Sequence, residues 1–275
     1  MKVRQYKGLA QYERAVRASE RRLARAICTF RRGPGYEVFQ SEEFPGFYAG
    51  NGIVSDGTRA ELGIDEWVAI FRSHFPRERY HHVTLVFPHG TAPAELFDEA
   101  RQRGLRVFPE VLMAAPVRGL ERRRAPGPAG QAPQLLDLAR DRERLFELHL
   151  LEAATADWFD SPESFRGLFN KTMALSERLG MEWLAVGRAD GHGPLEAALA
   201  YFDEQPVCRL QEVITSPAAR RRGLATRLIR ETAARAARRG IAAIGLVAEE
   251  GEDGHRLYRS LGFAELSRDV TIMEY

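Results

Sequence analysis

Residues 207–226, VCRLQEVITSPAARRRGLAT, constrain the fold of this chain more than any other segment. An apolar run ends at Thr215, Pro217 breaks it, and the pattern Arg220-x-x-Gly223-x-Ala225 then opens a helical stretch. The first turn of a helix has backbone N–H groups without intrahelical partners, and the helix dipole adds partial positive charge there. Because successive N–H groups in a tight turn also form a concave nest for oxyanions, the segment predicts a site for a phosphorylated ligand.

The residue types in this turn suit a close approach of phosphate oxygens to the backbone. Gly223 presents no Cβ to a ligand, and Ala225 keeps the next contact small. Arg220, Arg221 and Arg222 add positive charge, although arginines in such a turn can equally face solvent. The spacing differs from the dinucleotide fingerprint G-x-G-x-x-G and from the Gly-Lys-Ser/Thr of a nucleotide P-loop.

Composition excludes several other classes of function. The 275 residues carry a formal net charge of +2, too small for a global field that drives binding to nucleic acids or membranes. The arginine-rich stretch 9–27 is interleaved with glutamates, which is typical of a solvated helix face. Cys28 and Cys208 provide neither a disulfide framework nor a metal-binding spacing, and the histidines form no metal motif. We therefore expect a cytoplasmic monomer or homodimer without a metal and with no nucleic-acid or membrane partner.

A stretch rich in proline and glycine, residues 121–133, divides the chain into halves of residues 1–120 and 134–275. In the second half we expect strands at residues 134–137, 182–187, 195–202, 207–215 and 242–248, and a final strand pair at 263–266 and 270–275. Helices are expected there at residues 140–154, 164–179, 222–238 and 253–261. The alternation of strands and helices in the middle of this order predicts that part of the sheet is parallel.

The first half repeats part of this order. Helices are expected at residues 9–27, 64–74 and 94–103, and strands at 36–40, 47–54, 83–87 and 105–114. The run 84–87, a helix and Gly104 parallel the run 245–248, a helix and Gly262, which indicates an internal duplication. The expected fold class is α/β (α+β), with a mixed central sheet flanked by helices.

A second motif follows the turn after one further strand. The segments ITSPAARRRGLATRLI and HRLYRSLGFAE closely resemble, in order and spacing, the cofactor motif and the C-terminal helix motif of the GNAT acyl-CoA-dependent N-acyltransferases. The family's R-x-x-G-x-A falls on Arg220, Gly223 and Ala225. The resemblance covers residues 133–275 and implies an acyl-CoA N-acyltransferase fold there. With the duplication, it implies two GNAT-like domains in tandem.

The resemblance also implies roles for individual residues. The strand end Val213, Ile214 and Thr215 would pair its backbone with the pantetheine arm of acetyl-CoA. The pyrophosphate would be held by the backbone N–H groups of Arg220, Arg221, Arg222, Gly223, Leu224, Ala225 and Thr226. The helix tyrosine of the family falls on Tyr258, whose hydroxyl would protonate the departing thiolate, unless it serves only in packing.

The acceptor amine must lose a proton before it attacks the thioester. Glu212 is a candidate general base if its face of the strand, shared with Leu210 and Ile214, points to the cleft. If that face points to solvent, Glu212 is an ordinary surface charge. Glu249 and Glu250 at the end of the next strand are further candidates, and an amine that arrives neutral needs no dedicated base.

One position departs from the family pattern. Many members carry an asparagine seven residues before the tyrosine, where this chain has Gly251. A carboxylate, Asp253, lies five residues before the tyrosine instead. The departure concerns the finer cofactor contacts of the last helix and leaves the motif itself intact.

The first half lacks the residues that carry the chemistry. The position four residues before Gly104 is Ala100, and the stretch 64–79, taken as the counterpart of the phosphate turn, contains no glycine. We interpret residues 1–120 as a degenerate copy that shapes or covers the acceptor site. Residues 44–51 are a candidate wall of that site or, equally, a core strand entered by a turn.

These observations predict an enzyme that moves an acetyl group from acetyl-CoA directly to a primary amine of a small-molecule acceptor. Trp158 and Phe159 are candidate residues for lining the acceptor site. The alternative is a coenzyme A-binding pseudoenzyme or regulatory module that has lost acyl transfer, against which the retained Tyr258 argues.

Overall fold

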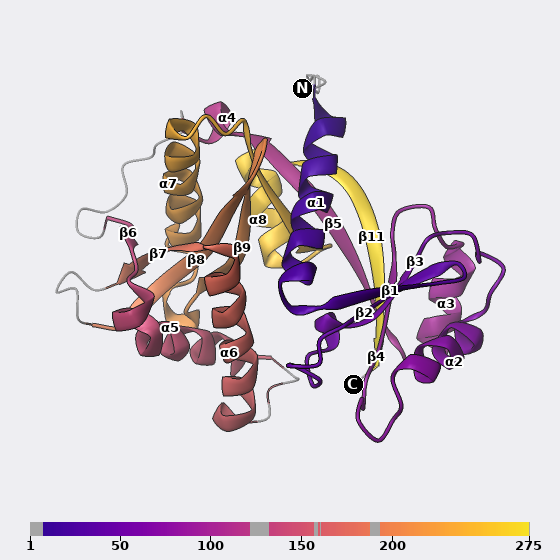
Figure 1. The fold of residues 1–275 in the computed structure, drawn as a ribbon. Coiled ribbons are helices and arrows are strands. Elements are labelled where there is room, and N and C mark those ends of the chain that lie inside the picture. The colour runs from indigo at the N-terminus through magenta and orange to yellow at the C-terminus, as the bar shows by residue number, and fades with distance from the viewer. Residues whose placement is uncertain (1–7, 122–131, 157–158, 160, 188–192, 275) are drawn as a thin grey trace. The chain divides into compact units, whose positions relative to one another are not determined.

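The computed structural model describes residues 8–121, 132–156, 159, 161–187 and 193–274 (Figure 1). These residues form two compact units, each assembled from separate stretches of the chain. Unit 1 comprises Met1–Ser19, Ala114–Leu246 and Leu257–Ala264, and unit 2 comprises Glu20–Met113, Val247–Arg256 and Glu265–Tyr275. The units therefore do not coincide with the contiguous halves that the sequence suggests. Most of the expected linker, residues 122–131, lies outside the described residues.

Unit 1 is built on strands in the order β10-β9-β8-β7-β6. They are β6 (Gln134–Leu135), β7 (Glu182–Gly187), β8 (Leu195–Glu204), β9 (Val207–Thr215) and the first residues of β10 (Ala243–Glu249). Strands β6 to β9 pair antiparallel with their neighbours, whereas β10 runs parallel to β9. The expectation of a mixed, partly parallel sheet is confirmed.

Helices flank this sheet. Helices α5 (Leu138–Ala153) and α7 (Leu224–Arg238) pack against β8 and β9, α6 (Pro162–Leu179) packs against α5, and the short α4 (Val117–Glu121) packs against α7. The apolar stripe of α7 is buried as its helical spacing predicts, with Leu228, Ile229 and Ala233 fully enclosed. None of the described helices, including α1 (Leu9–Ile27), is long and apolar enough to cross a membrane.

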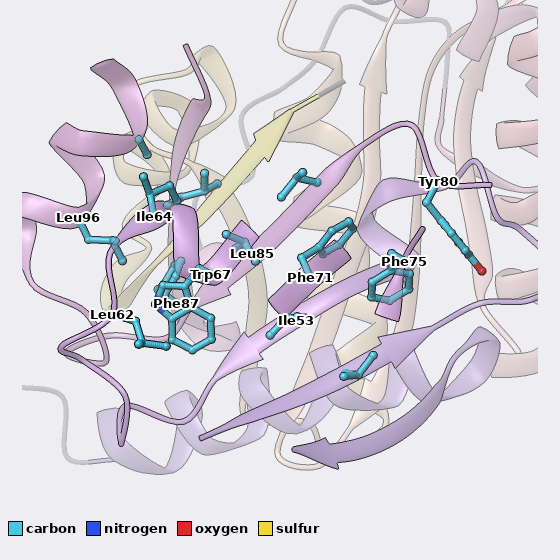
Figure 2. Close-up of a cluster of buried hydrophobic side chains, with 14 residues drawn as sticks. Ile53, Leu62, Ile64, Trp67, Phe71, Phe75, Tyr80, Leu85, Phe87 and Leu96 are labelled. Carbon is cyan, nitrogen blue, oxygen red and sulfur yellow. The ribbon is translucent and has the colours of Figure 1, made fainter. Parts of the chain in front are cut away.

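Unit 2 is built on strands in the order β1-β2-β3-β4-β11-β5. They are β1 (Thr29–Gly33), β2 (Tyr36–Gln40), β3 (Asn51–Ser55), β4 (Val83–Phe87), most of β5 (Arg106–Pro116) and most of β11 (Ala264–Glu274). Helices α2 (Ile64–His74) and α3 (Ala94–Gln102) lie side by side on this unit (Figure 1). Figure 2 shows the core between helices and strands, where Trp67 and Phe71 of α2 meet Leu85 and Phe87 of β4.

Unit 2 differs from expectation in an additional strand, β1, and in the later start of β3. Strand β1 has no clear signal in the sequence because its residues, TFRRG, are mostly polar and exposed. The strand expected at 47–54 begins only at Asn51, whose side-chain amide donates hydrogen bonds to Phe44 O at 2.9 Å and Phe47 O at 2.8 Å. These bonds hold the preceding residues as a loop, which explains the later start.

The expected final strand pair is wrong, because residues 264–274 form one continuous strand, β11. The polar residues in its middle stay extended because they have partners. Arg268 pairs with Glu250 at 2.5 Å, and Asp269 accepts a hydrogen bond from His89 N at 3.0 Å. Beyond them β11 pairs antiparallel with β4 from Val270 onward.

Two series of elements follow the same order along the chain. β3, α2, β4, α3 and β5 correspond in turn to β9, α7, β10, α8 (Asp253–Leu261) and β11. The pairs β3–β4 and β9–β10 are both parallel. Helices α3 and α8 also end alike: Leu105 N donates to Ala100 O at 3.0 Å, and Phe263 N donates to Tyr258 O at 3.1 Å. This repeated order supports the internal duplication, which remains a prediction.

Candidate functional site

The turn between β9 and α7 has the conformation of an anion-binding nest. After a single 3-10 turn at Pro217–Ala219, Arg221 and Gly223 take the left-handed conformation, with φ angles of 64° and 77°. Glycine adopts this conformation without strain, which explains its place at the N-cap of α7. A Cβ built on Gly223 would meet no described atom within 4 Å, so the space in front of the backbone is open to a ligand.

The N-terminus of α7 is uncapped. The N-cap residue Gly223 makes no side-chain hydrogen bond to the first turn, and that turn contains no acidic residue. The N–H groups of Leu224, Ala225 and Thr226 therefore point beyond the helix end, where the helix dipole favours an anion. The predicted cofactor residues 220–226 thus lie in one turn whose geometry fits a pyrophosphate.

The arginine side chains of the turn are exposed, and two of them form ion pairs. Arg222 donates to Glu196 Oε1 of β8 at 3.0 Å, and the Arg220 guanidinium lies 3.9 Å from Glu152 of α5. Exposed ion pairs of this kind each contribute at most about 1 kcal/mol. These two ion pairs connect the turn to β8 and α5, and their contribution to the stability of the fold is small.

Strand β9 separates from β10 part-way along its length. Their parallel pairing ends at Arg209 and Gly245, while β9 continues to Thr215. Residues Val213 to Thr215 therefore have β8 on one side and no described strand on the other. A free strand edge accepts an extended ligand through backbone hydrogen bonds, as predicted for the pantetheine arm.

Glu212 lies on a β-bulge and not in a regular strand. Its φ angle is +48°, and the register with β8 shifts between Ala198 and Ala200. A bulge re-aims the side chain, so the alternation that grouped Glu212 with Leu210 and Ile214 is interrupted. Both of those residues are buried, whereas Glu212 is half-buried. The assignment of all three to one face is therefore wrong.

The other base candidates belong to a different unit. Glu249 and Glu250 lie in unit 2, whereas Glu212 and Tyr258 lie in unit 1. Glu250 is paired with Arg268. Burial raises the pKa of Glu249, and the charge of Glu252 adds to this rise.

Tyr258 is enclosed in unit 1. The residue is only 8% exposed, and its ring packs against Phe263 with ring centroids 5.6 Å apart. Burial raises the pKa of Tyr258 to about 12, although the charge of Arg209 opposes this rise. The hydroxyl is therefore protonated at neutral pH and is available as a proton donor, and the ring also contributes to packing.

The position that departs from the family pattern has a backbone role. Gly251 has a φ angle of +85°, and its N–H donates to His255 Nδ1 at 3.1 Å. Asp253 is exposed and pairs with Arg256 at 2.7 Å. Neither residue therefore presents an amide in place of the asparagine.

The corresponding helix start in unit 2 is occupied by carboxylates of the chain itself. Glu66 accepts a hydrogen bond from Gly63 N at 2.9 Å, and Glu99 accepts one from Ile64 N at 3.1 Å. Residues 64–79 were expected to be the counterpart of the phosphate turn before α7. This expectation is wrong, because most of these residues form α2 itself and the turn before α2 consists of residues 56–63. The amides that α7 leaves open are thus filled at α2.

Two residues without a predicted role lie near Glu212. His149 of α5 is 6% exposed, and Glu152 follows it by one turn on the same helix. Burial lowers the pKa of His149, which the Glu212 carboxylate opposes. Burial also raises the pKa of Glu152; Arg220 opposes this rise and Glu212 adds to it. Polar residues at i and i+3 on an otherwise apolar helix face were the available signal in the sequence.

Of the two predicted acceptor-lining aromatics, Phe159 is half-buried and packs against Phe165, with ring centroids 6.2 Å apart. Trp158 lies outside the described residues. The lining of an acceptor site by these two residues stays a prediction.

Comparisons with known proteins agree with this geometry. Residues 135–263 match the sequence model of the acetyltransferase (GNAT) family. A GCN5-related N-acetyltransferase from Kribbella flavida is 17% identical, with a TM-score of 0.63, covering 95% of this chain and 94% of that one. A conserved protein of unknown function from Staphylococcus epidermidis is 12% identical, with a TM-score of 0.69, covering 90% of this chain and 94% of that one.

A third structure is a tandem GNAT protein from the clavulanic acid biosynthesis pathway. It is 13% identical, with a TM-score of 0.58, and the match covers 100% of this chain and 96% of that one. Identities this low establish a shared fold. No curated protein sequence matches the chain.

The fold and the open turn define the class of an acyl-CoA-dependent N-acyltransferase. Residues 135–263 match the acetyltransferase (GNAT) family, and the chain shares its fold with GNAT proteins, one of them a tandem GNAT protein.

Proposed function

We propose that the protein transfers an acetyl group from acetyl-CoA directly to a primary amine of a small-molecule acceptor. The observation that carries this proposal is the uncapped N-terminus of α7 beside the free edge of β9. The first suits a pyrophosphate and the second suits an extended pantetheine arm. The proposal also keeps the protein in the cytoplasm, where the thiols of Cys28 and Cys208 would stay reduced.

In this proposal the residues of unit 1 have separate roles. The backbone of Val213 to Thr215 aligns the acyl donor, and Gly223 with the following amides holds its phosphates. Tyr258 donates a proton to the leaving thiolate, and Glu212 assists removal of the proton from the amine. Support for the two proton-transfer roles comes from the buried, protonated hydroxyl and from the bulge that re-aims the carboxylate.

A thiol-release assay separates this proposal from a coenzyme A-binding pseudoenzyme. The protein is incubated with acetyl-CoA and a broad panel of primary amines, and free thiol and acetylated amine are measured together. An N-acetyltransferase produces both in equal amounts with at least one amine. Binding of acetyl-CoA with no acetylated product from any amine of the panel would support the pseudoenzyme.

Replacing Tyr258 by phenylalanine tests the proton donor. Tyr258→Phe keeps the ring that packs on Phe263 and removes only the hydroxyl. We expect kcat to fall about 100-fold, the lower end for loss of a general acid, while the Kd for coenzyme A changes little. Steady-state kinetics and calorimetry measure the two quantities. An unchanged kcat would leave Tyr258 with a packing role alone.

A further inference from the structure

His149 holds a buried hydrogen-bonding atom that lacks a described partner. Its residue is 6% exposed, and its ring lies against Phe169 at 5.3 Å and Trp183 at 5.7 Å between centroids. Its Nε2 makes no hydrogen bond to the residues that the structure describes. Leaving such an atom unsatisfied costs about 1 to 3 kcal/mol, so a buried orphan of this kind calls for a water or a ligand.

The carboxylates of Glu212 and Glu152 lie in the surroundings of His149. Glu212, re-aimed by the bulge in β9, interacts electrostatically with both His149 and Glu152. Glu152 in turn lies 3.9 Å from Arg220, which begins the phosphate-binding turn. The cluster of His149, Glu152 and Glu212 therefore adjoins the proposed cofactor site within unit 1.

The chemistry of this cluster selects its ligand. A neutral imidazole nitrogen and two carboxylates are all hydrogen-bond acceptors, and the carboxylates carry negative charge. A primary ammonium group supplies three N–H donors and a positive charge, and therefore complements all three. An anionic group beside the amine would be repelled. Lys171 on α6 is the other charged side chain that acts on His149, and its positive charge favours the neutral imidazole.

We propose that His149, Glu152 and Glu212 form the binding site for the acceptor's amino group, with His149 Nε2 as the atom that removes its proton. This inference rests on the proposed N-acetyltransferase function and adds both a base and a substrate class. The acceptor is a primary amine that arrives as an ammonium ion and carries no anionic group next to it.

The proton balance of the step is simple. The ammonium gives one proton to His149 Nε2, and the Glu212 carboxylate stabilises the resulting imidazolium. The neutral amine then forms the C–N bond with the acetyl carbon as the C–S bond breaks. The thiolate takes the Tyr258 proton, and the second proton lost by nitrogen restores the Tyr258 hydroxyl. His149 releases its proton to solvent, so each turnover yields one amide, one thiol and one proton.

The first test is the pH profile of kcat/KM with the best amine of the panel. We expect His149→Asn to lower kcat/KM about 100-fold and to abolish the loss of activity that the wild type shows toward acidic pH. Glu147→Gln, on an exposed position of the same helix, is the matched control and keeps the wild-type profile. Unchanged affinity for acetyl-CoA shows that the variant is folded. A wild-type profile in a folded His149→Asn protein overturns the proposal and leaves the N-acetyltransferase function standing.

Glu152→Gln provides a variant at a half-buried position, in case loss of the buried imidazole prevents folding. Removing one negative charge raises KM for cationic amines by about 10-fold, equivalent to about 1.4 kcal/mol, with a smaller effect on kcat. An unchanged KM contradicts the site.

A binding measurement is independent of turnover. In protein labelled with ¹⁵N-histidine, the His149 resonances are followed while butylamine or butanol is added with coenzyme A present. Butylamine shifts them and butanol does not if the site binds an amino group. If no amine in the panel is acetylated, the proposed N-acetyltransferase function fails. The titration still tests the amine site separately, because His149 resonances that do not shift with butylamine reject that site.

Discussion

Gly223 and Gly240 stand at opposite ends of α7 with nearly the same backbone conformation, φ angles of 77° and 75°. At neither position would an added Cβ meet a described atom within 4 Å. The two glycines thus share one conformational requirement, and only Gly223 faces the proposed phosphate site. This pair allows the strain of a left-handed residue to be separated from its contribution to ligand binding.

We expect Gly223→Ala and Gly240→Ala each to destabilise the fold by about 1 to 2 kcal/mol, the cost of a left-handed alanine. Only Gly223→Ala should also weaken acetyl-CoA binding, by about 10-fold or more, because its methyl group occupies the space before the amides. Urea unfolding and calorimetric titration measure the two effects. Equal Kd values in the two variants would argue against phosphate binding at this turn.

Some of the site residues are predictable from sequence, and others are not. The turn at 220–226 and Tyr258 are predicted as site residues from local motifs, and this assignment stays a prediction. The conformation of Glu212 depends on how β9 pairs with β8, which spacing along one strand does not reveal. His149 joins the proposed site through the approach of α5 to β9, a tertiary contact that the spacing of His149 and Glu152 along α5 does not by itself reveal.

At the scale of elements, α2 and α7 show two uses of a helix N-terminus. The first turn of α2 contains Asp65 and Glu66, and its amides bind Glu66 and Glu99. The first turn of α7 has no acidic residue and no side-chain cap. The carboxylates complement the dipole of α2 and so contribute to stability, whereas α7 keeps this interaction available for a ligand.

Glu99→Gln tests the structural use of the α2 terminus. We expect it to lower the free energy of unfolding by about 1 kcal/mol, because a neutral amide interacts more weakly with the helix end. Acetyl-CoA affinity should not change. Chemical denaturation of this variant is compared with Glu78→Gln, an exposed residue outside the helices. A Glu99 variant as stable as that control would contradict the capping role.

Most elements were predictable because their apolar spacing or their capping residues are strong. Helix α1 and strands β2, β4, β7 and β9 have the expected bounds. The exceptions are elements decided by tertiary pairing. Strand β1 is polar and pairs with β2, and β11 stays continuous through its polar middle because unit 2 supplies partners.

At the scale of the whole molecule, stability depends on pH through a carboxylate in the sheet of unit 2. Burial raises the pKa of Glu110 to about 6, against the hydrogen bond from Thr271 Oγ1 at 2.6 Å. The charges of Glu20, Asp269 and Glu249 add to this rise. Because the folded pKa lies above the unfolded one, this group stabilises the fold below about pH 4.5, and that contribution is lost as the pH rises through 6.

Glu110→Gln should remove this pH dependence. At pH 8 we expect the variant to be more stable than the wild type by up to about 2 kcal/mol, and at pH 4.5 the two should be nearly equal. Urea unfolding at both pH values measures the difference, with Glu37→Gln on β2 as the control. A variant less stable than the wild type at pH 8 would contradict the cost of ionising this half-buried group.

The assembly of unit 2 from separate stretches of the chain has a consequence for biosynthesis. His89 follows β4 and binds Asp269 of β11, 180 positions later in the chain. A ribosome that adds about 5 to 20 residues per second needs on the order of 10 to 40 seconds to cover that distance. Throughout this interval β4, with Leu85 and Phe87, waits without the neighbouring strand that completes its sheet. Unit 2, although encoded largely by the first part of the gene, is thus completed only when β11 has been synthesised.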